Sequence, residues 1–179
     1  MKKTFFLYLA AFLFCLSTSG IVHAQIFVDF GPGGIKGSSQ NRDFKDWVEA
    51  NTFDYQIGNQ QAPTGTRSRR GAPVFSNVIL TKTFDRATVP LLKHVTIGQS
   101  IPEVKINLVR SSERGFQTYF EVKLGKVNVV NHALHGESQG PMSETFELAF
   151  EAIEYTGYDE NGRVMDTPFK WNTSTNSSN

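Results

Sequence analysis

Two histidines with the spacing of metal ligands lie in the second half of the chain. His132 and His135 are separated by two residues, and Glu137 follows them closely. Imidazole and carboxylate groups bind transition metals, but a stable site takes three or four ligands, and the sequence supplies no second cluster to complete one. We therefore interpret this segment as a polar hairpin loop, and the sequence implies neither a metal nor another cofactor. A hydrolase that works through these histidines is the alternative, supported by spacing alone.

Acidic residues recur near the end of the chain, at Glu144, Glu147, Glu151 and Glu154. Glycosidases use a pair of carboxylates that flank a substrate cleft. The regular spacing of these glutamates among Phe and Leu residues is instead typical of the solvated face of a strand. The sequence also lacks a Gly-x-Ser-x-Gly nucleophile motif and a phosphate-binding loop that opens a helix. We therefore expect a non-enzymatic protein without catalytic residues.

Three arginines form the main local concentration of positive charge. Arg67, Arg69 and Arg70 lie in a stretch rich in Gly, Pro and Thr at 60–73, which predicts a long exposed loop. Aromatic residues do not alternate with them as in single-strand binders, and the formal net charge of the whole chain is only +1, so we expect no nucleic-acid partner. Because long loops are often functional and arginine is enriched at interfaces, this loop is predicted to contact another protein.

The first 24 residues have the layout of a cleavable export signal. Lys2 and Lys3 precede an apolar run at 5–16, and small residues follow at the end of the segment. The apolar run is shorter than the roughly 20 residues of a spanning helix, so no stable membrane anchor is expected. We predict cleavage between Ala24 and Gln25 and a protein that is secreted or periplasmic.

Removal of this leader changes the composition of the folding unit. It leaves 155 residues with 16 Lys+Arg against 17 Asp+Glu, and it removes the single cysteine. No disulfide can then stabilise the domain, which must depend on burial and hydrogen bonding. The expected folded domain covers 25–171, and the Asn-, Ser- and Thr-rich tail 172–179 is expected to be disordered.

A period of two residues dominates the mature chain. Polar and apolar residues alternate from Phe116 to Leu124, which predicts a half-buried strand. The parity of the apolar residues changes near Ala152, which indicates a bulge or a strand shared between two sheets. The pair Asn161-Gly162 predicts a hairpin turn. Further strands are expected at 26–30 with 34–37, 47–57, 75–81, 104–110, 126–130, 146–150 and 163–171.

A single short helix interrupts the strands. Thr88 is the expected N-cap, and Gly98 is placed to end the helix in a left-handed conformation. Apolar residues recur at helical spacing, at Leu91, Leu92 and Val95, whereas His94 falls on the polar side and is expected to be solvated. About eight strands and one helix predict a mainly β fold, a β-barrel or sandwich of two sheets with one short α-helix.

The order of these features resembles the Hcp family, the haemolysin-coregulated proteins that form the tube of type VI secretion. The resemblance covers nearly all of the mature chain and depends on the order and spacing of its segments. These are Ile35 to Ser38, Trp47 to Glu49, Leu80 to Leu92, Glu147 to Ile153 and Lys170 to Asn172.

The resemblance implies a non-enzymatic subunit that assembles into hexameric rings with a wide lumen. Such rings stack into a tube, receive effectors in the lumen and work with other type VI components. The loop at 60–73 takes the place of the family's extended loop, which reaches a neighbouring ring, so Arg67, Arg69 and Arg70 are the expected stacking contacts. Trp47 and Trp171 are expected to anchor the core or subunit contacts. Because the family normally lacks an export signal, the alternative is an exported Hcp-like binding or carrier protein outside the contractile tube.

Overall fold

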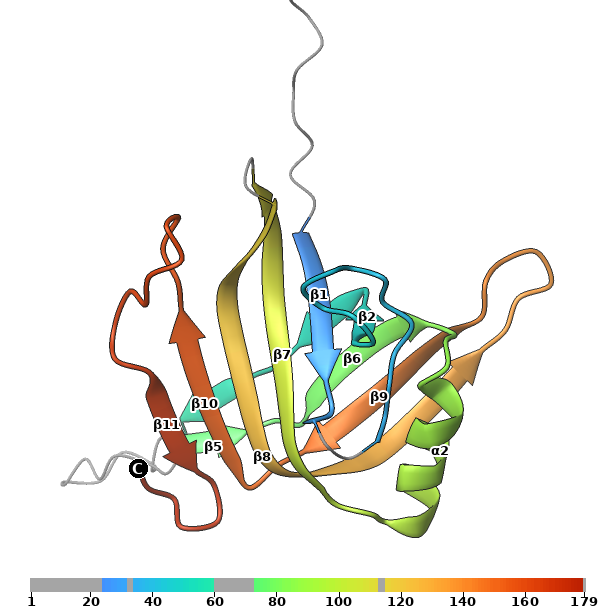
Figure 1. Ribbon diagram of the computed structural model, residues 1–179. Coiled ribbons are helices and arrows are strands. Elements are labelled where there is room, and N and C mark those ends of the chain that lie inside the picture. Colours follow the sequence, from blue (N-terminus) through green and yellow to red (C-terminus); the bar gives the residue numbers. More distant parts are fainter. Residues whose placement is uncertain (1–23, 32–33, 60–72, 113–114, 179) are drawn as a thin grey trace, which may run out of the picture.

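The computed structural model describes residues 24–31, 34–59, 73–112 and 115–178. Within these residues it contains eleven strands and one helix (Figure 1). In chain order they are β1 (Ala24–Asp29), β2 (Val48–Ala50), β3 (Thr52–Asp54), β4 (Ile57–Asn59), β5 (Pro73–Phe75), β6 (Val78–Thr83), α2 (Thr88–Ile97), β7 (Ile101–Ser112), β8 (Gly115–His135), β9 (Ser143–Ala149), β10 (Ala152–Gly157) and β11 (Phe169–Asn172).

The strands form two sheets that share β8. The first sheet has the order β2-β1-β7-β8-β10-β11, and the second has the order β8-β9-β6-β3, with every pairing antiparallel. A separate hairpin joins β4 to β5. The sheets curve around a common interior, and α2 lies at one side of the barrel (Figure 1). The prediction of a mainly β, two-sheet barrel with one short helix is confirmed.

The long strand β8 belongs to both sheets. Its first part pairs with β7 and β10, and its last part pairs with β9. The bend between these parts lies at Gly125 and Lys126, where Lys126 has a positive φ of 52°. The chain then changes sheet between Ala149, the last residue of β9, and Ala152, the first of β10. The change of parity near Ala152 marks this passage: β9 and β10 are two strands in different sheets, and neither a bulge within one strand nor a single shared strand is present there.

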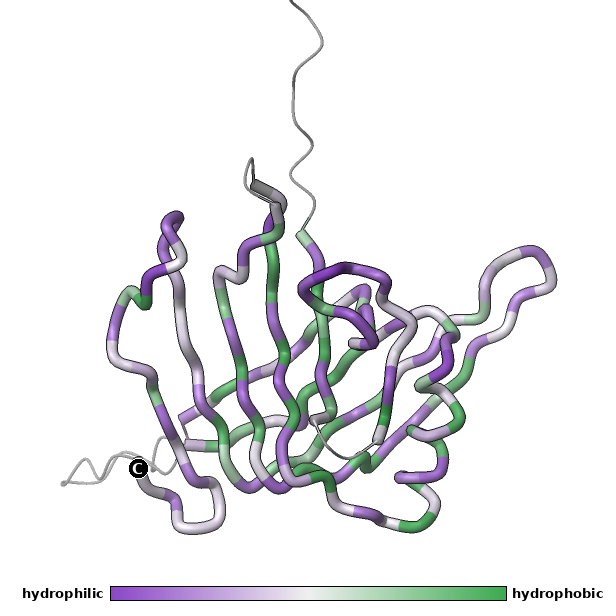
Figure 2. The backbone as a smooth tube through the Cα atoms, in the orientation of Figure 1, coloured by the Kyte–Doolittle hydropathy of each residue, from purple (hydrophilic) through white to green (hydrophobic). Residues whose placement is uncertain are grey.

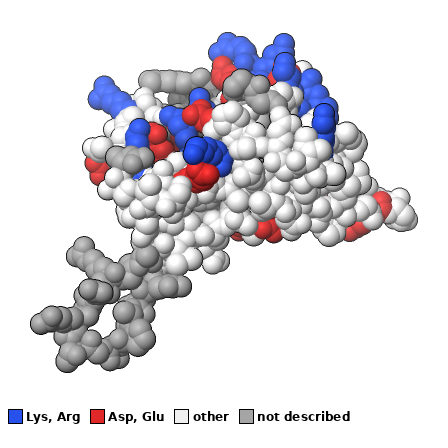
Figure 3. All heavy atoms as spheres, turned by 90° about the horizontal axis from the view of Figure 1, so that it is seen from below, with Lys and Arg blue, Asp and Glu red and all other residues white. Residues whose placement is uncertain are grey.

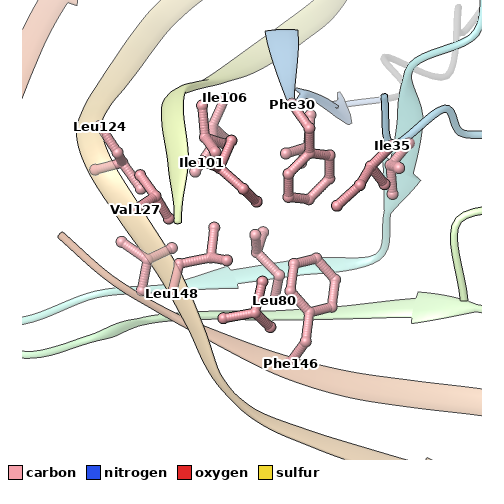
Figure 4. Close-up of a cluster of buried hydrophobic side chains, with 14 of the residues drawn as sticks. Phe30, Ile35, Leu80, Ile101, Ile106, Leu124, Val127, Phe146 and Leu148 are labelled. Carbon is pink, nitrogen blue, oxygen red and sulfur yellow. The ribbon is translucent and has the colours of Figure 1, made fainter. Parts of the chain in front are cut away.

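The barrel closes where β2 passes directly into β3. Only Asn51 separates these strands, and its backbone N–H donates to the Thr81 carbonyl of β6 at 2.7 Å. Hydrophobic and hydrophilic residues alternate along the strands (Figure 2). Apolar side chains from both sheets meet inside, including Phe30, Ile35, Leu80, Ile101, Ile106, Leu124, Val127, Phe146 and Leu148 (Figure 4).

The segment at 34–47 covers the outer face of β1 instead of forming the strand expected at 34–37. The Phe44 ring stacks on that of Phe27 with centroids 4.3 Å apart, and Trp47 meets Phe44 edge-on at 5.2 Å. Gly37 donates its N–H to the Asp46 carbonyl at 2.7 Å. A Cβ at Gly37 would overlap the carbonyl of Trp47, so only glycine allows this close approach.

Other expected strands are shorter than the sequence indicated. The stretch at 47–57 is divided among β2, β3 and β4, and the stretch at 75–81 is interrupted at Ser76 and Asn77. At 163–171 only β11 is a strand, and before it Val164 forms an isolated bridge with Tyr158 and the Met165 N–H donates to the Gly157 carbonyl at 3.0 Å. The hairpin predicted at Asn161-Gly162 is confirmed: Gly162 has a φ of 76°, and Tyr158 bridges to Val164.

Helix α2 begins and packs differently from the expectation. Its N-cap is Ala87, without a side-chain cap, so Thr88 does not cap it. The Asp85 carboxylate accepts the Ala87 N–H at 2.8 Å. His94 is 6% exposed, and its Nδ1 lies 3.0 Å from the Gln99 carbonyl oxygen. The expectation of a solvated His94 is therefore wrong, because this residue shares the buried face with Leu91, three residues earlier. Gly98 ends the helix in the left-handed conformation, as predicted.

The chain after β11 forms a local turn where the sequence predicts a disordered tail. The Asn172 Oδ1 accepts the N–H groups of Ser174 and Thr175, each at 3.0 Å. Asn172 and Ser177 also form a β-bridge. These hydrogen bonds give residues 173–177 a defined conformation.

Candidate assembly surfaces and a buried ionic cluster

The residues predicted from the sequence as contact and processing sites fall in two places. Arg67, Arg69 and Arg70 lie outside the described residues. Their loop joins the paired ends of β4 and β5, where Asn59 opposes Pro73. Ala24 and Gln25, the predicted cleavage site, are the first two residues of β1.

A buried ion pair that the sequence analysis missed lies beneath the start of α2. Lys82 on β6 and Glu144 on β9 are register partners, and both side chains are 0% exposed. The Lys82 Nζ directly contacts the Glu144 Oε1. Removing two charges from water is costly unless they are paired and hydrogen-bonded, so this contact must be a specific structural feature.

Asp85 and Thr88 complete the surroundings of the lysine. The Asp85 Oδ1 accepts from the Lys82 Nζ at 2.6 Å. The Thr88 hydroxyl accepts from the same Nζ at 3.3 Å and donates to the Glu144 Oε1 at 2.7 Å. The other Asp85 oxygen accepts the Ser38 N–H at 3.1 Å. The buried ionic cluster, Lys82, Asp85, Thr88 and Glu144, therefore joins β6, β9, α2 and the segment at 34–47.

His132 lies against this cluster. A register shift between Val129 and Asn131 on β8 turns the His132 side chain inward, where it is 1% exposed. Its Nε2 is 2.7 Å from the Glu144 Oε2, although the angles are not those of a hydrogen bond, and the Nδ1 has no hydrogen-bond partner among the described residues. The interpretation of His132 as part of a polar loop is therefore wrong, because β8 continues through it and ends at His135.

The expectation that Glu144 lies on a solvated strand face is also wrong. Glu144 shares its parity with the buried Phe146 and Leu148, and Lys82 shares its parity with Val78 and Leu80. The burial of both charges could therefore have been predicted from the two-residue alternation, which places Lys82 and Glu144 inside the barrel. Glu147, Glu151 and Glu154 are partly or fully exposed, as expected.

The cluster has the chemistry of a structural anchor. The Lys82 ammonium occupies the space between two carboxylates and a hydroxyl, where a cation would otherwise be needed. Within the described residues, no group of three or more His, Cys, Asp or Glu side chains could hold a metal ion. His132 and His135 do not converge, since one is buried and the other exposed.

The outer face of the first sheet is densely charged. Ion pairs join Lys105 to Glu103 at 3.4 Å and Lys123 to Glu121 at 3.2 Å. Lys170 on β11 reaches Glu154 on β10 at 3.1 Å. Seen from below, lysines and arginines gather on one side of the molecule, where this sheet lies (Figure 3). Because each lysine has an acidic neighbour, most of this charge is balanced within the sheet.

The outer face of the second sheet carries far fewer charged residues than that of the first sheet. Its outward residues among those described include no Lys or Arg, and only two acids, Asp54 and Glu147. The others are small or neutral: Thr52, Ile79, Thr81, Thr83, Asn128, Asn131, Ala133, His135, Ser143, Thr145 and Ala149. The Thr52 and Thr81 hydroxyls are 2.8 Å apart and hydrogen-bonded. We call these residues the neutral face.

Glu147 is the central acid of the neutral face. Its carboxylate accepts from the Asn131 Nδ2 at 3.0 Å and from the Asn77 Nδ2 at 3.2 Å. These two hydrogen bonds stabilise the charged form and lower the pKa of the Glu147 carboxyl. The residue is thereby held as an anion in a surface with few other charges.

An aromatic cluster fills the end of the barrel opposite α2. The rings of Tyr155 and Phe169 stack with centroids 6.0 Å apart, and Trp171 continues the stack at 6.2 Å from Phe169. Burial raises the pKa of the Tyr155 phenol. Trp171 is thus a packing anchor, and Phe169, 48% exposed, extends the apolar surface to the edge strand β11.

Comparisons with known proteins give the family. The family model described as type VI secretion system effector, Hcp, matches residues 27–156. A search of curated protein sequences finds no match. No helix among the described residues is long and apolar enough to cross a membrane.

Solved structures share the fold. A type six secretion system protein has a TM-score of 0.79 and 22% identity, covering 88% of this chain and 100% of its own. Hcp1 from Salmonella typhimurium has a TM-score of 0.70 and 18% identity, covering 87% and 99%. Hcp1 from E. coli EAEC 042 has a TM-score of 0.67 and 22% identity, covering 84% and 97%. The family match and the shared barrel together place this chain in the Hcp family of type VI secretion proteins.

Proposed function

We propose that this chain is a non-enzymatic subunit that assembles into hexameric rings, which stack into a tube of the type VI secretion kind. The observation that carries the proposal is the Hcp family match over residues 27–156, together with the barrel it encodes. Its partners are further copies of itself, other type VI components and the effectors that the rings receive.

Two strand edges of the second sheet that lack a strand partner among the described residues support ring closure. Within the described chain, β3 pairs only with β6, and the last part of β8 pairs only with β9. These edges lie at opposite ends of the sheet order β8-β9-β6-β3. A head-to-tail contact needs two different surfaces on each copy, and it closes into a ring when the rotation between copies is suitable.

The neutral face is the surface that we assign to the lumen. It is uninterrupted by Lys or Arg and carries mostly hydroxyl, amide and methyl groups, as in the row Thr52, Thr81, Thr145 and Ala133. Such a surface binds passing proteins weakly, because apart from Ile79, Asp54 and Glu147 it offers only small or neutral side chains. The charged outer face of the first sheet is then available to other components.

The loop at 60–73 is proposed as the stacking contact between rings. Its arginines, Arg67, Arg69 and Arg70, lie outside the described residues, and the assignment depends on their charge and on the family resemblance. The β4–β5 hairpin at the base of the loop is a separate two-stranded sheet, and Phe75 of β5 packs it against Phe150 and Trp171, which gives the loop a fixed base on the barrel; β5 lies behind β10 and β11 in Figure 1.

Assembly can be tested on the protein that begins at Gln25. Size-exclusion chromatography with negative-stain electron microscopy should give rings, and a strict monomer at high concentration would contradict the proposal. Arg69→Glu with Arg70→Glu should weaken stacking more than folding, so that single rings and thermal stability persist, because charges in an exposed loop contribute little to stability. Arg42→Glu with Lys45→Glu makes the same charge change at exposed residues elsewhere and should leave stacking intact.

We further propose that residues 1–24 direct export; the subunit then acts in the periplasm or outside the cell, and any rings form there and not in the contractile tube. Deletion of the secretion-system ATPase separates this route from export through the tube. Export that continues without the ATPase supports the leader, and loss of export contradicts it.

A further inference from the structure

The predicted cleavage site coincides with the start of a strand. Ala24 pairs with Arg110 and Gln25 pairs with Val109, both on β7. The neighbouring strand β2 begins to pair only at Ile26. Cleavage after Ala24 would therefore place a new amino terminus inside the hydrogen-bonded ladder, as the first residue of β1.

We infer that Gln25, once it is the amino-terminal residue, is converted to a pyroglutamyl lactam. This inference depends on the export and cleavage proposed above. Its chemistry needs only Gln25 itself: the α-amine and the side-chain carboxamide of one residue close a five-membered ring.

The reaction is balanced without a co-reactant. The nitrogen lone pair of the α-amine attacks the Cδ of the Gln25 carboxamide and forms a C–N bond. The original Cδ–Nε2 bond then breaks, and its nitrogen leaves as ammonia after taking up the proton that the α-amine loses. One amide replaces another, so nothing is oxidised or reduced. The attacking amine must be unprotonated, and free α-amino groups titrate near pH 8, so a usable fraction exists at neutral pH.

The surroundings of Gln25 favour the neutral lactam over an ammonium group. Removal of Ala24 leaves its register partner Arg110 without a residue opposite it on β1, so the new amine lies at the very end of the paired strand. Gln25 also shares the outer face of β1 with Phe27, which is 1% exposed, and opposes Val109, which is 0% exposed. A charge next to apolar side chains is unfavourable, whereas the lactam is uncharged and retains one N–H for the ladder.

The side chain of Gln25 is also available to react. It is only partly buried, and within the described part of the chain it makes no hydrogen bond. The carboxamide can therefore fold back onto its own amine without breaking an existing interaction.

The experiment uses the full chain produced in a host that exports it. The protein is purified from the periplasm or medium, incubated at pH 8, and its amino-terminal peptide is analysed by mass spectrometry. We expect a peptide that begins at residue 25 and is lighter by one ammonia molecule, with an intact protein that has lost one positive charge in isoelectric focusing. Gln25→Ser is the matched control, which keeps a small polar residue after the cleavage site and cannot form the ring.

The mass and the first residue of the purified chain distinguish failure of the lactam inference from failure of the export proposal. A chain that begins at Gln25 and keeps its full mass after incubation overturns the inference and leaves export intact. A chain that begins at Met1 overturns both export and the inference. Rings that fail to form while the lactam is present contradict the tube proposal alone.

Discussion

Lys82 and Glu144 face each other across β6 and β9 with neither side chain exposed to solvent. A buried pair of this kind is weak as a source of net stability, because desolvation offsets much of the attraction. Each partner nevertheless requires the other, since removal of one would leave the other as an unpaired charge in the barrel interior. The pair also positions the residues around it: Thr88 from α2 and Asp85 from the preceding turn both bind it.

Lys82→Met is expected to lower the free energy of unfolding by about 3–5 kcal/mol, because it leaves Glu144 buried without its counterion. The double variant Lys82→Met with Glu144→Leu should be more stable than Lys82→Met alone, since it removes the uncompensated charge. Asp85 keeps its hydrogen bonds from the Ala87 and Ser38 N–H groups in both variants. Urea unfolding followed by circular dichroism measures the difference, and equal stability of the two variants would contradict a role for the pair.

The two histidines should respond differently to substitution. His132→Ala is expected to cost about 1–3 kcal/mol, because it opens a cavity beside Glu144 and removes a polar neighbour of a buried carboxylate. His135→Ala, at the exposed end of β8, is the control and should change stability by less than about 0.5 kcal/mol. Thermal melting of both variants checks this. Equal effects would mean that His132 is not buried against the cluster.

Gly37→Ala is expected to cost about 1–3 kcal/mol, because its methyl group would overlap the Trp47 backbone. The segment at 34–47 should loosen from β1, which exposes Trp47 and shifts its fluorescence to longer wavelength. Gly58→Ala on β4 is the control, since nothing lies within 4 Å of a Cβ there. An unchanged fluorescence spectrum in Gly37→Ala would show that the segment accommodates the methyl group.

Acid should destabilise the protein partly through Glu147. Its pKa in the folded state lies below the ordinary value of 4.5, because Asn131 and Asn77 donate to the carboxylate. The resulting stabilisation is fully present above pH 4.5 and is lost as the pH falls through the lower folded-state pKa. Glu147→Gln should therefore flatten the fall of the urea midpoint between about pH 5 and pH 3. Glu160→Gln, in the exposed turn after β10, is the control, and identical pH profiles for the Glu147 variant and the natural protein would refute the assignment.

The alternation of residues was sufficient to predict most of the fold. The period of two identified the middle of β7 and parts of β8, although β8 was expected as two strands, at 116–124 and 126–130, and Gly98 correctly marked the end of the helix. The change of parity at Ala152 marks the passage from β9 in one sheet to β10 in the other, which the alternation alone did not separate from a bulge or a shared strand. The exact interruptions, such as the one at Ser76 and Asn77, were not predictable, because they depend on which strands become neighbours.

The buried ionic cluster was predictable only in part. The alternation places Lys82 and Glu144 on the inward side of their strands. A buried charge needs an opposite charge facing it, and the partner of Lys82, Glu144, lies 62 residues later in the sequence. His132 could not be placed at all, because its inward direction follows from the register shift between Val129 and Asn131. Local sequence carries no record of such a shift.

Strand β8 has a consequence for when the molecule becomes competent to assemble. It hydrogen-bonds to β7, which precedes it, and to β9 and β10, which follow it. Neither sheet can therefore be completed before nearly the whole domain has been synthesised and, if exported, has crossed the membrane. Pairing between distant segments is slow to form, and incomplete sheets leave edges exposed. The edges of β3 and β8 that lack a strand partner reach their final positions only in the completed barrel. The chain must therefore fold completely before it can self-associate.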